Sequence, residues 1–290
     1  MVATVVITCP RREEMNYSNC CWVADPPEDF VLQFKGSNES WKLGPAFKER
    51  VLNGDEHEGF ELSEASAICI ATQINGSRKG IQAIAKIRVQ IPPEMNNPWD
   101  YYPGVDYSVY KSTYLSVWSH TEFSILKYLT LKGSKCTPRY IGHEIRDQSD
   151  HDYLPGGYVV YTLMEKLPGI NLVDWPDFPL EKRNRFRIAF GKAIRKFYSW
   201  GSVHRDPQRH NIIWDENTDR CWIIDLEDID YEDPPRKFVP RRDWADWGII
   251  GVIPDGELDP MAPDNYDECP DDDALYALAT RTKTRQLCER

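Results

Sequence analysis

The sequence predicts an α+β fold in two parts, and three patterns lead to this prediction. Nearly regular alternation of apolar residues predicts a strand at residues 81–91, and apolar residues at helical spacing predict helices at residues 112–131 and 186–197. Two short apolar runs around a polar turn predict a β-hairpin at residues 212–224. A chain of 290 residues buries a large core, and this length suits one two-lobed domain better than two independent ones.

The predicted strand at residues 81–91 carries a lysine at its centre. Successive side chains of a strand point to opposite faces, so Lys86 and Ile84 share a face. The preceding residues 75–80 read Asn-Gly-Ser-Arg-Lys-Gly, which predicts the turn of a hairpin with a strand at residues 69–74. Two interpretations of Lys86 remain open, a solvated face of an amphipathic strand or a binding residue.

The predicted helix at residues 112–131 places a glutamate, Glu122, on an otherwise apolar face with Leu115, Trp118, Ile125 and Leu129. An isolated buried charge is very costly, so a buried Glu122 needs a partner, and Lys86 would satisfy both charges. In the competing explanation, Ser119 and Glu122 form an S-x-x-E capping box at a later helix start.

A loop and a hairpin follow the helix at residues 186–197, which Gly201 is expected to end. Residues 203–211 read Val-His-Arg-Asp-Pro-Gln-Arg-His-Asn. The apolar runs 212–214 and 221–224 flank a polar turn, so they are expected to pair. Pairing places Asn211 and Asp225 at the same end of two adjacent strands.

The residue types in this region are those that phosphoryl transfer requires. Moving a phosphoryl group from ATP needs an acid that orients the attacking hydroxyl, together with an amide and a second acid that hold Mg²⁺. Asp206, Asn211 and Asp225 have the chemistry and spacing for these roles. In the structural alternative, His204 is a core histidine and the acids form turns, where Asp and Asn are common for backbone reasons.

Residues 204–211 resemble the catalytic loop H-R-D-x-x-x-x-N of protein kinases, and residues 224–227, Ile-Asp-Leu-Glu, look more like the corresponding segment of aminoglycoside and choline phosphotransferases. The closest resemblance is to the kinase-like proteins of filamentous fungi, over roughly residues 55 to 250. It implies a two-lobed protein-kinase-like fold, with a small lobe of antiparallel sheet plus helix and a mainly helical, shortened large lobe.

The resemblance also implies a set of site residues and the cofactors ATP and Mg²⁺. The implied catalytic residues are Asp206, His204 and Arg209, and the implied metal ligands are Asn211 and Asp225. Residues 83–86, Ala-Ile-Ala-Lys, resemble the V-A-I-K strand of kinases. This assigns phosphate binding to Lys86, positioning of that lysine to Glu122, and the adenine pocket to Ile84. The implied phosphate-covering loop contains Ser63, Ala65 and Ser66, and the implied adenine hinge contains Met164, Glu165 and Leu167.

Several positions depart from the kinase pattern. Gln208 occupies the place of a lysine that touches the γ-phosphate, and Arg209 is the candidate substitute. Residues 62–67 contain no glycine, although kinases have G-x-G-x-x-G there, and Glu227 stands where D-F-G has glycine. No A-P-E motif follows, which favours a small-molecule acceptor over a protein.

Two functional hypotheses result. The first is an ATP- and Mg²⁺-dependent phosphotransferase that transfers the γ-phosphoryl group to a hydroxyl or amine of an unidentified small molecule. The second is a weak or inactive pseudokinase that acts as an interaction module for a protein partner.

The expected domain organisation follows from these motifs. Residues 1–55 form an N-terminal extension, and residues 56–165 form the small lobe with an insertion at residues 92–111. Residues 166–255 form the large lobe, and residues 256–290 form an acidic tail with a short terminal helix.

Composition limits the classes of partner. The formal net charge of −11 argues against general binding to nucleic acid or anionic membranes, which relies on Lys and Arg. No apolar run approaches the length of a membrane span. The eight cysteines are scattered without a C-x-x-C pair, as expected for reduced thiols, so we expect a cytoplasmic protein.

Overall fold

The structure is a computed structural model. It describes residues 21–23, 25–27, 30–54, 62–102, 104–172 and 177–250. The whole of the predicted acidic tail at residues 256–290, with its terminal helix, therefore lies outside the described residues. The chain divides into two compact units. Unit 1 comprises residues 1–124 and 140–166, and unit 2 comprises residues 125–139 and 167–290.

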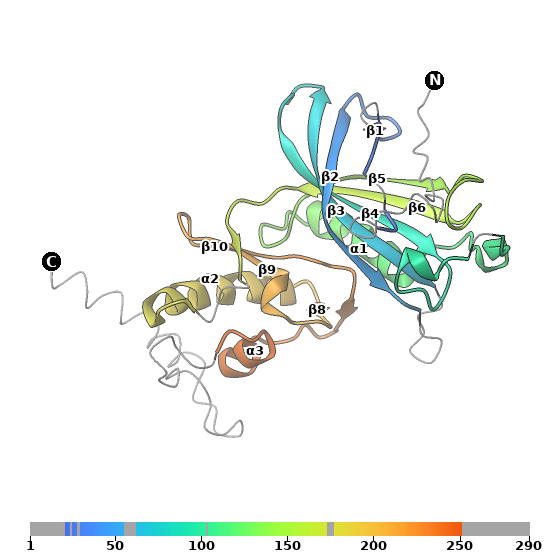
Figure 1. The fold of residues 1–290 in the computed structure, drawn as a ribbon. Helices are drawn as coiled ribbons and strands as arrows, with labels where there is room; N and C mark the ends of the chain where they lie inside the picture. The colour runs from blue at the N-terminus through green and yellow to red at the C-terminus, as the bar shows by residue number, and fades with distance from the viewer. Residues whose placement is uncertain are drawn as a thin grey trace, which may run out of the picture. The chain divides into compact units, whose positions relative to one another are not determined.

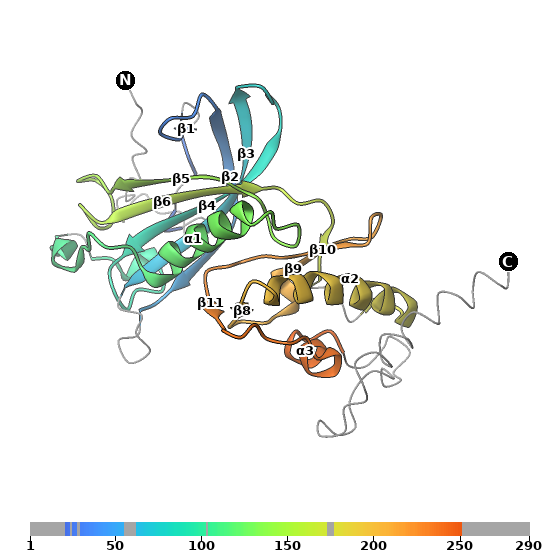
Figure 2. The same ribbon diagram turned by 180° about the vertical axis from the view of Figure 1, so that it is seen from behind.

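Unit 1 is built on a six-stranded sheet in the order β1-β2-β3-β4-β6-β5, in which all neighbouring strands are antiparallel. Figures 1 and 2 show that the sheet is strongly twisted and that helix α1 lies against one of its faces. The strands are β1 (Val31–Gln33), β2 (Ser40–Leu52), β3 (Ser63–Asn75), β4 (Gln82–Ile91), β5 (Tyr140–Asp147) and β6 (Tyr158–Glu165).

The hairpin of β3 and β4 confirms the prediction for the lysine strand. Thr72 pairs with Gln82 next to the turn, and Ile68 pairs with Lys86 further along. The turn is closed by backbone hydrogen bonds from Gln73 N to Ile81 O, at 2.9 Å, and from Gly80 N to Gln73 O, at 2.8 Å. Lys86 therefore lies in the middle of a paired strand, with β6 on its other side.

Helix α1 (Val117–Leu131) begins five residues later than the predicted start at residue 112. The Oγ atom of Ser116 accepts a hydrogen bond from the backbone N–H of Ser119, at 3.0 Å, as an N-cap residue does. Ser112 to Leu115 precede this cap and follow the insertion at residues 92–111, which contains the short 3₁₀ helices η2 (Pro98–Asp100) and η3 (Tyr107–Tyr110). The helical spacing of apolar residues continues on the N-terminal side of the cap, and for this reason the predicted helix was too long.

The core of unit 1 depends on the segment before β1. Many of the side chains of β3 and β4 that face this core are small, since Ala65, Ala67, Ala71, Ala83 and Ala85 are all fully buried. Small residues leave space against the sheet. Large side chains fill it, among them the fully buried Trp22 from the start of the described chain, together with Phe30, Leu32, Tyr153 and Tyr161. Trp22, Phe30 and Leu32 are thus part of the core of unit 1.

In its described residues, unit 2 combines helices with short paired strands. It includes the end of α1, the helices α2 (Leu180–Tyr198) and α3 (Pro240–Asp246), and the short 3₁₀ helix η5 (Arg209–Asn211) before the hairpin. Its strands are β7 (Ile170–Asn171), β8 (Ser202–His204), β9 (Ile212–Asp215), β10 (Arg220–Ile223) and β11 (Ile229–Tyr231). They form a three-stranded sheet, β10-β9-β7, and a two-stranded one, β11-β8. A mainly helical lobe is not evident among the described residues.

Helix α2 and the hairpin of β9 and β10 confirm their predictions. Gly201, with a φ angle of 75°, ends the helical region, and its N–H donates to the carbonyl of Tyr198 at 2.7 Å. A residue with a Cβ atom is disfavoured at this angle, which explains the glycine. Arg185 ties α2 to the hairpin turn through Glu216 O, at 2.8 Å, and Asp219 Oδ1, at 2.9 Å.

Helix α3 is anchored on α2 by a buried acid. Asp243 has no exposed surface, and its carboxylate accepts hydrogen bonds from Val239 N at 2.5 Å and Tyr198 Oη at 3.0 Å. Arg187 of α2 is also fully buried and donates through two nitrogens to the carbonyl of Ile249. These contacts hold the end of the described chain against α2.

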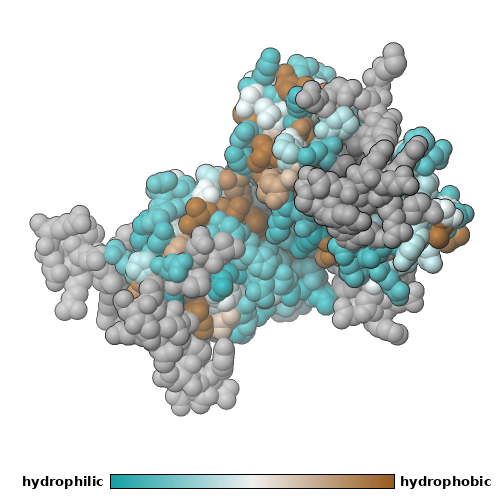
Figure 3. All heavy atoms as spheres, in the orientation of Figure 1, coloured by the Kyte–Doolittle hydropathy of each residue, from teal (hydrophilic) through white to brown (hydrophobic). Residues whose placement is uncertain are grey.

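The described surface is mainly hydrophilic on the face drawn in Figure 3, where hydrophobic residues occur in small patches. Among the residues that the structure describes, no helix is both long and apolar enough to cross a membrane. Cys69, Cys136 and Cys221 are buried thiols, and burial raises the pKa of each. These three side chains are therefore protonated and poorly reactive near neutral pH.

We expect Trp22→Ala to destabilise the protein by about 3–5 kcal/mol, because it leaves a cavity where a fully buried indole packed edge-on against Tyr153. Chemical denaturation of the native protein and the variant measures this difference. Tyr102→Ala is the matched control, since the Tyr102 side chain is 59% exposed and its loss is expected to change stability by less than about 0.5 kcal/mol. Equal stability of the Trp22 variant and the native protein would contradict the assignment of Trp22 to the core.

Candidate functional site

The loop between β8 and β9 in unit 2 brings two of the predicted residues together. The side-chain amide of Asn211 donates to the carbonyl oxygen of Asp206, at 3.0 Å, and to its Oδ2 atom, at 3.2 Å. Asn211 is buried, whereas the side chain of Asp206 is 50% exposed. Asn211 thus holds both the backbone carbonyl and the carboxylate of Asp206, and the carboxylate remains accessible to a ligand.

The hairpin places Asp225 beside this pair. Ile223 pairs with Ile212 at the end of β10 and β9, and Ile224 N then donates to Asn211 O at 2.9 Å. Asp225 follows directly, with a φ angle of 61° in the left-handed region, which Asp tolerates better than most residues. The prediction that Asn211 and Asp225 lie at the same end of adjacent strands is confirmed.

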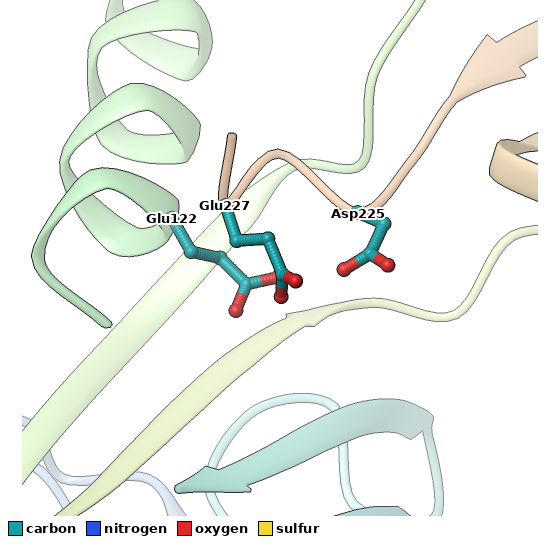
Figure 4. Close-up of side chains that lie close together, drawn as sticks. All are labelled: Glu122, Asp225 and Glu227. Atoms are coloured by element: carbon teal, nitrogen blue, oxygen red, sulfur yellow. The ribbon is translucent and has the colours of Figure 1, made fainter. Parts of the chain in front are cut away.

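Glu227 is a second acid close to Asp225 that the sequence interpretation did not include among the metal ligands. A carboxylate oxygen of Glu227 lies within 4.8 Å of one of Asp225. Figure 4 shows both side chains on the loop that follows β10. Two carboxylates at this separation suit a divalent cation, because Mg²⁺ and Ca²⁺ prefer oxygen ligands. The sequence signal for a role of Glu227 was its position two residues after Asp225, in Ile224-Asp225-Leu226-Glu227.

His204 links the two sides of this loop. Its Nδ1 atom accepts a hydrogen bond from Asp206 N, at 3.2 Å, so Nε2 carries the proton and donates to Ile224 O, also at 3.2 Å. The ring packs edge-on against Trp247, with centroids 5.4 Å apart. His204 is 4% exposed, and burial lowers its pKa. These contacts are those of a neutral positioning residue.

Arg209, the candidate substitute for the missing lysine, lies near the segment after α3. Its Nη1 atom is 3.4 Å from the carbonyl oxygen of Gly248. Nearer to Asp206 is His210, whose Nε2 atom is 3.9 Å from Asp206 Oδ2. Asn171 of β7 supports the loop by donating to the carbonyl of His210, at 2.5 Å. Sequence reasoning included neither His210 nor Asn171.

The ion pair predicted in unit 1 is present. Lys86 Nζ lies 3.0 Å from Glu122 Oε1, and the two side chains are 5% and 3% exposed. Figure 4 shows Glu122 projecting from helix α1. The capping-box alternative is wrong, because the Oγ atom of Ser119 instead donates to Glu64 Oε1, at 2.6 Å. Ile84 shares the strand face of Lys86 and is partly buried.

A second cation and a second acid complete this cluster, and sequence reasoning assigned no role to either. Arg88 donates to Glu122 Oε2 at 3.3 Å and to Glu64 Oε2 at 3.0 Å. Glu64 Oε1 also accepts from Tyr158 Oη, at 2.7 Å. Burial, followed by the Glu64 charge, raises the pKa of Tyr158, so the phenol remains a donor. We call Glu64, Lys86, Arg88 and Glu122 the four-charge cluster.

The expected phosphate-covering loop at residues 62–67 is wrong as a structural element. Ser63, Ala65 and Ser66 are buried residues of strand β3, and they pair with Ile91, Val89 and Arg88 of β4. A paired strand has its backbone N–H groups committed to its neighbours and does not fold over a phosphate. Ala and Ser alternate in this segment, and because Ala is only weakly apolar the pattern did not predict a strand.

The predicted hinge residues lie where the chain leaves the sheet. Met164 and Glu165 end strand β6, with Met164 buried and Glu165 exposed. Leu167 is the first residue of unit 2 after this strand. The chain thus passes from unit 1 to unit 2 within the hinge segment.

No protein-family model matches the chain, and no curated protein matches it either. The candidate site therefore stands on its residues and their geometry.

We expect unit 2 to lose stability when the pH falls below the ordinary histidine pKa of about 6.5. The pKa of His204 is lowered in the folded state, so on acidification the unfolded chain takes up a proton that the folded chain does not. His204→Gln replaces both hydrogen bonds with an amide that does not titrate. Melting temperatures at about pH 7.5 and about pH 5.5 should fall more for the native protein than for this variant. An equal fall in both proteins would contradict the neutral, linking role of His204.

Proposed function

We propose that the protein is an ATP- and Mg²⁺-dependent phosphotransferase with a two-lobed, kinase-like fold. The observation that carries the proposal is the hydrogen-bonded pair of Asp206 and Asn211, joined through the hairpin backbone to Asp225. Phosphoryl transfer is achieved largely by positioning and by charge stabilisation, and this arrangement supplies both an acid for the acceptor and acids for the metal.

In unit 2, each group has a role that fits its surroundings. Asp206 accepts and orients the proton of the attacking hydroxyl or amine, which is consistent with its half-exposed carboxylate. Asn211 and Asp225 hold Mg²⁺, and Glu227 adds a further oxygen ligand. His204 keeps Asp206 and the strand before Asp225 in register, and so acts as a positioning residue.

Unit 1 contributes the groups that bind the nucleotide. Lys86 binds the α- and β-phosphates, and Glu122 keeps its side chain extended toward them. Ile84 and Met164 are cross-strand partners on β4 and β6 and contribute to the adenine pocket. The next residues, Glu165 to Leu167, supply the hinge. The buried position of Ser63, Ala65 and Ser66 in β3 removes them from this assignment.

A small-molecule acceptor is favoured by the sequence after the metal motif, which contains no A-P-E motif of the kind that ends the activation segment of protein kinases. Within the described residues from Glu227 to residue 250, the chain forms β11 and α3. The second candidate function is a pseudokinase that binds a protein partner. Its support is Gln208, an exposed neutral side chain where kinases place a lysine.

We expect the melting temperature to rise only when ATP and Mg²⁺ are added together, and this rise to disappear in Asp225→Ala. A ligand at a hundredfold its dissociation constant stabilises the folded state by about 2.7 kcal/mol, which thermal unfolding readily detects. Lys86→Met should remove the same stabilisation. The matched control is Asp230→Ala, which removes a 61% exposed acid of β11. Absence of any shift in the native protein at millimolar nucleotide would favour the pseudokinase function.

We expect Asp206→Asn to bind ATP with Mg²⁺ as the native protein does but to turn over about 10²–10⁴-fold more slowly, because the amide cannot accept the acceptor's proton. ADP formation in a screen of small alcohols and amines measures turnover, and isothermal titration measures binding. Full turnover by the variant would exclude the role of Asp206.

A further inference from the structure

The four-charge cluster of unit 1 contains one cation more than a lysine–glutamate pair requires. Each oxygen of Glu122 has its own cation, because Oε1 lies 3.0 Å from Lys86 Nζ and Oε2 lies 3.3 Å from Arg88 Nε. Arg88 also binds Glu64 through Nη1, at 3.0 Å. These ion pairs join two cations to two acids, and all four side chains are at most 5% exposed.

Glu64 connects this cluster to the beginning of helix α1. Its Oε1 atom accepts from Ser119 Oγ, at 2.6 Å, and from Tyr158 Oη, at 2.7 Å. The phenol oxygen of Tyr158 in turn accepts from the backbone N–H of Ser116, the N-cap of α1, at 3.1 Å. The first turns of α1 are thus bound to strands β3, β4 and β6 through buried hydrogen bonds.

We propose that Arg88 and Glu64 are positioning residues that keep α1 and Glu122 in place whether or not a nucleotide is bound. If α1 moved away, Arg88 would lose one carboxylate and Glu64 would lose a hydroxyl donor, all in a buried environment. A buried charge that loses its partner is strongly destabilising, so such a movement is opposed.

The same arrangement determines how Lys86 behaves toward a phosphate, and this step rests on the proposed function. When Lys86 shares its ammonium with a phosphate, Glu122 retains the guanidinium of Arg88 on its second oxygen. The carboxylate is therefore never left buried without a cation. The pair is assembled in advance, and nucleotide binding does not require α1 to move.

Hydrogen exchange of the α1 amides tests the first part without any ligand. In Arg88→Met we expect the α1 amides to exchange at least about tenfold faster than in the native protein, because the lost contacts lower the free energy of local opening. Arg88→Lys keeps the charge but lacks the planar fork that reaches two carboxylates, so an intermediate rate is expected. Arg78→Met is the matched control, since Arg78 lies at the β3–β4 turn with a 44% exposed side chain. If Arg88→Met does not fold, Arg88→Lys carries the comparison.

Binding of ATP with Mg²⁺ and of adenosine, both by isothermal titration, tests the second part. Arg88→Met should weaken ATP binding at least about tenfold and change adenosine binding less than about twofold, because the loss acts through Lys86 on the phosphates. In the native protein, the α1 amides that exchange by local opening should exchange at the same rate with and without ATP. Rescue of ATP affinity in Arg88→Lys would support the positioning role.

Three results would overturn the inference. They are native-like α1 exchange in Arg88→Met, strong protection by ATP of the native α1 amides that exchange by local opening, and an equal loss of ATP and adenosine binding in Arg88→Met. A failure of the proposed function gives a different result, because the native protein itself then binds no ATP. In that case the role of Arg88 in nucleotide binding is also excluded.

Discussion

The balance of buried charge between the sheet and helix α1 is the constraint on which unit 1 depends. A buried carboxylate or ammonium without a partner is very costly, so Glu64, Lys86, Arg88 and Glu122 must be buried together or not at all. Each charge comes from β3, β4 or α1, and Tyr158 adds a donor from β6. Correct pairing of these elements is therefore a condition for burying any of them. A mainly structural cluster of this kind also presents a lysine in a defined orientation, which is what phosphate binding requires.

Unit 2 solves a similar positioning problem with neutral groups. Asn211 holds Asp206, and His204 joins the Asp206 backbone to the carbonyl of Ile224, one residue before Asp225. Trp247 packs on the ring of His204, and the buried Asp243 anchors α3 on α2. The carboxylate of Asp206 is thus oriented by a hydrogen bond from an amide that carries no charge. In the proposed function this carboxylate receives the proton of the acceptor.

Prediction from sequence succeeded where the determining interactions are local. The β9–β10 hairpin, helix α2 with its glycine end, and the β3–β4 hairpin were all predicted from residues close together in the chain. It failed where the pattern was weak or continued past a boundary. The segment beginning at Ser63 was expected to be a loop, because alternating Ala and Ser have no strong apolar period. The predicted start of helix α1, residue 112, was too early. The helical spacing of apolar residues continues on the N-terminal side of Ser116, where the cap shows that the helix has not yet begun. The mainly helical second lobe, which only the resemblance implied, is not evident in the described chain.

The sequence by itself determined the identity and spacing of the candidate site residues, from Lys86 and Glu122 to Asp206, Asn211 and Asp225. Periodicity and turn composition placed these residues on their strands, helix and loops, and the resemblance to kinases singled them out as candidates. Only the tertiary structure decided that Arg88 and Glu64 complete the cluster around Glu122, that Trp22 fills the space left by small residues on β3 and β4, and that His204 links Asp206 to Ile224. Their partners lie far apart in the chain, as with Arg88 and Glu122, which are 34 residues apart. Contacts at such separations depend on the packing of whole elements, and no local pattern encodes which side chains then meet.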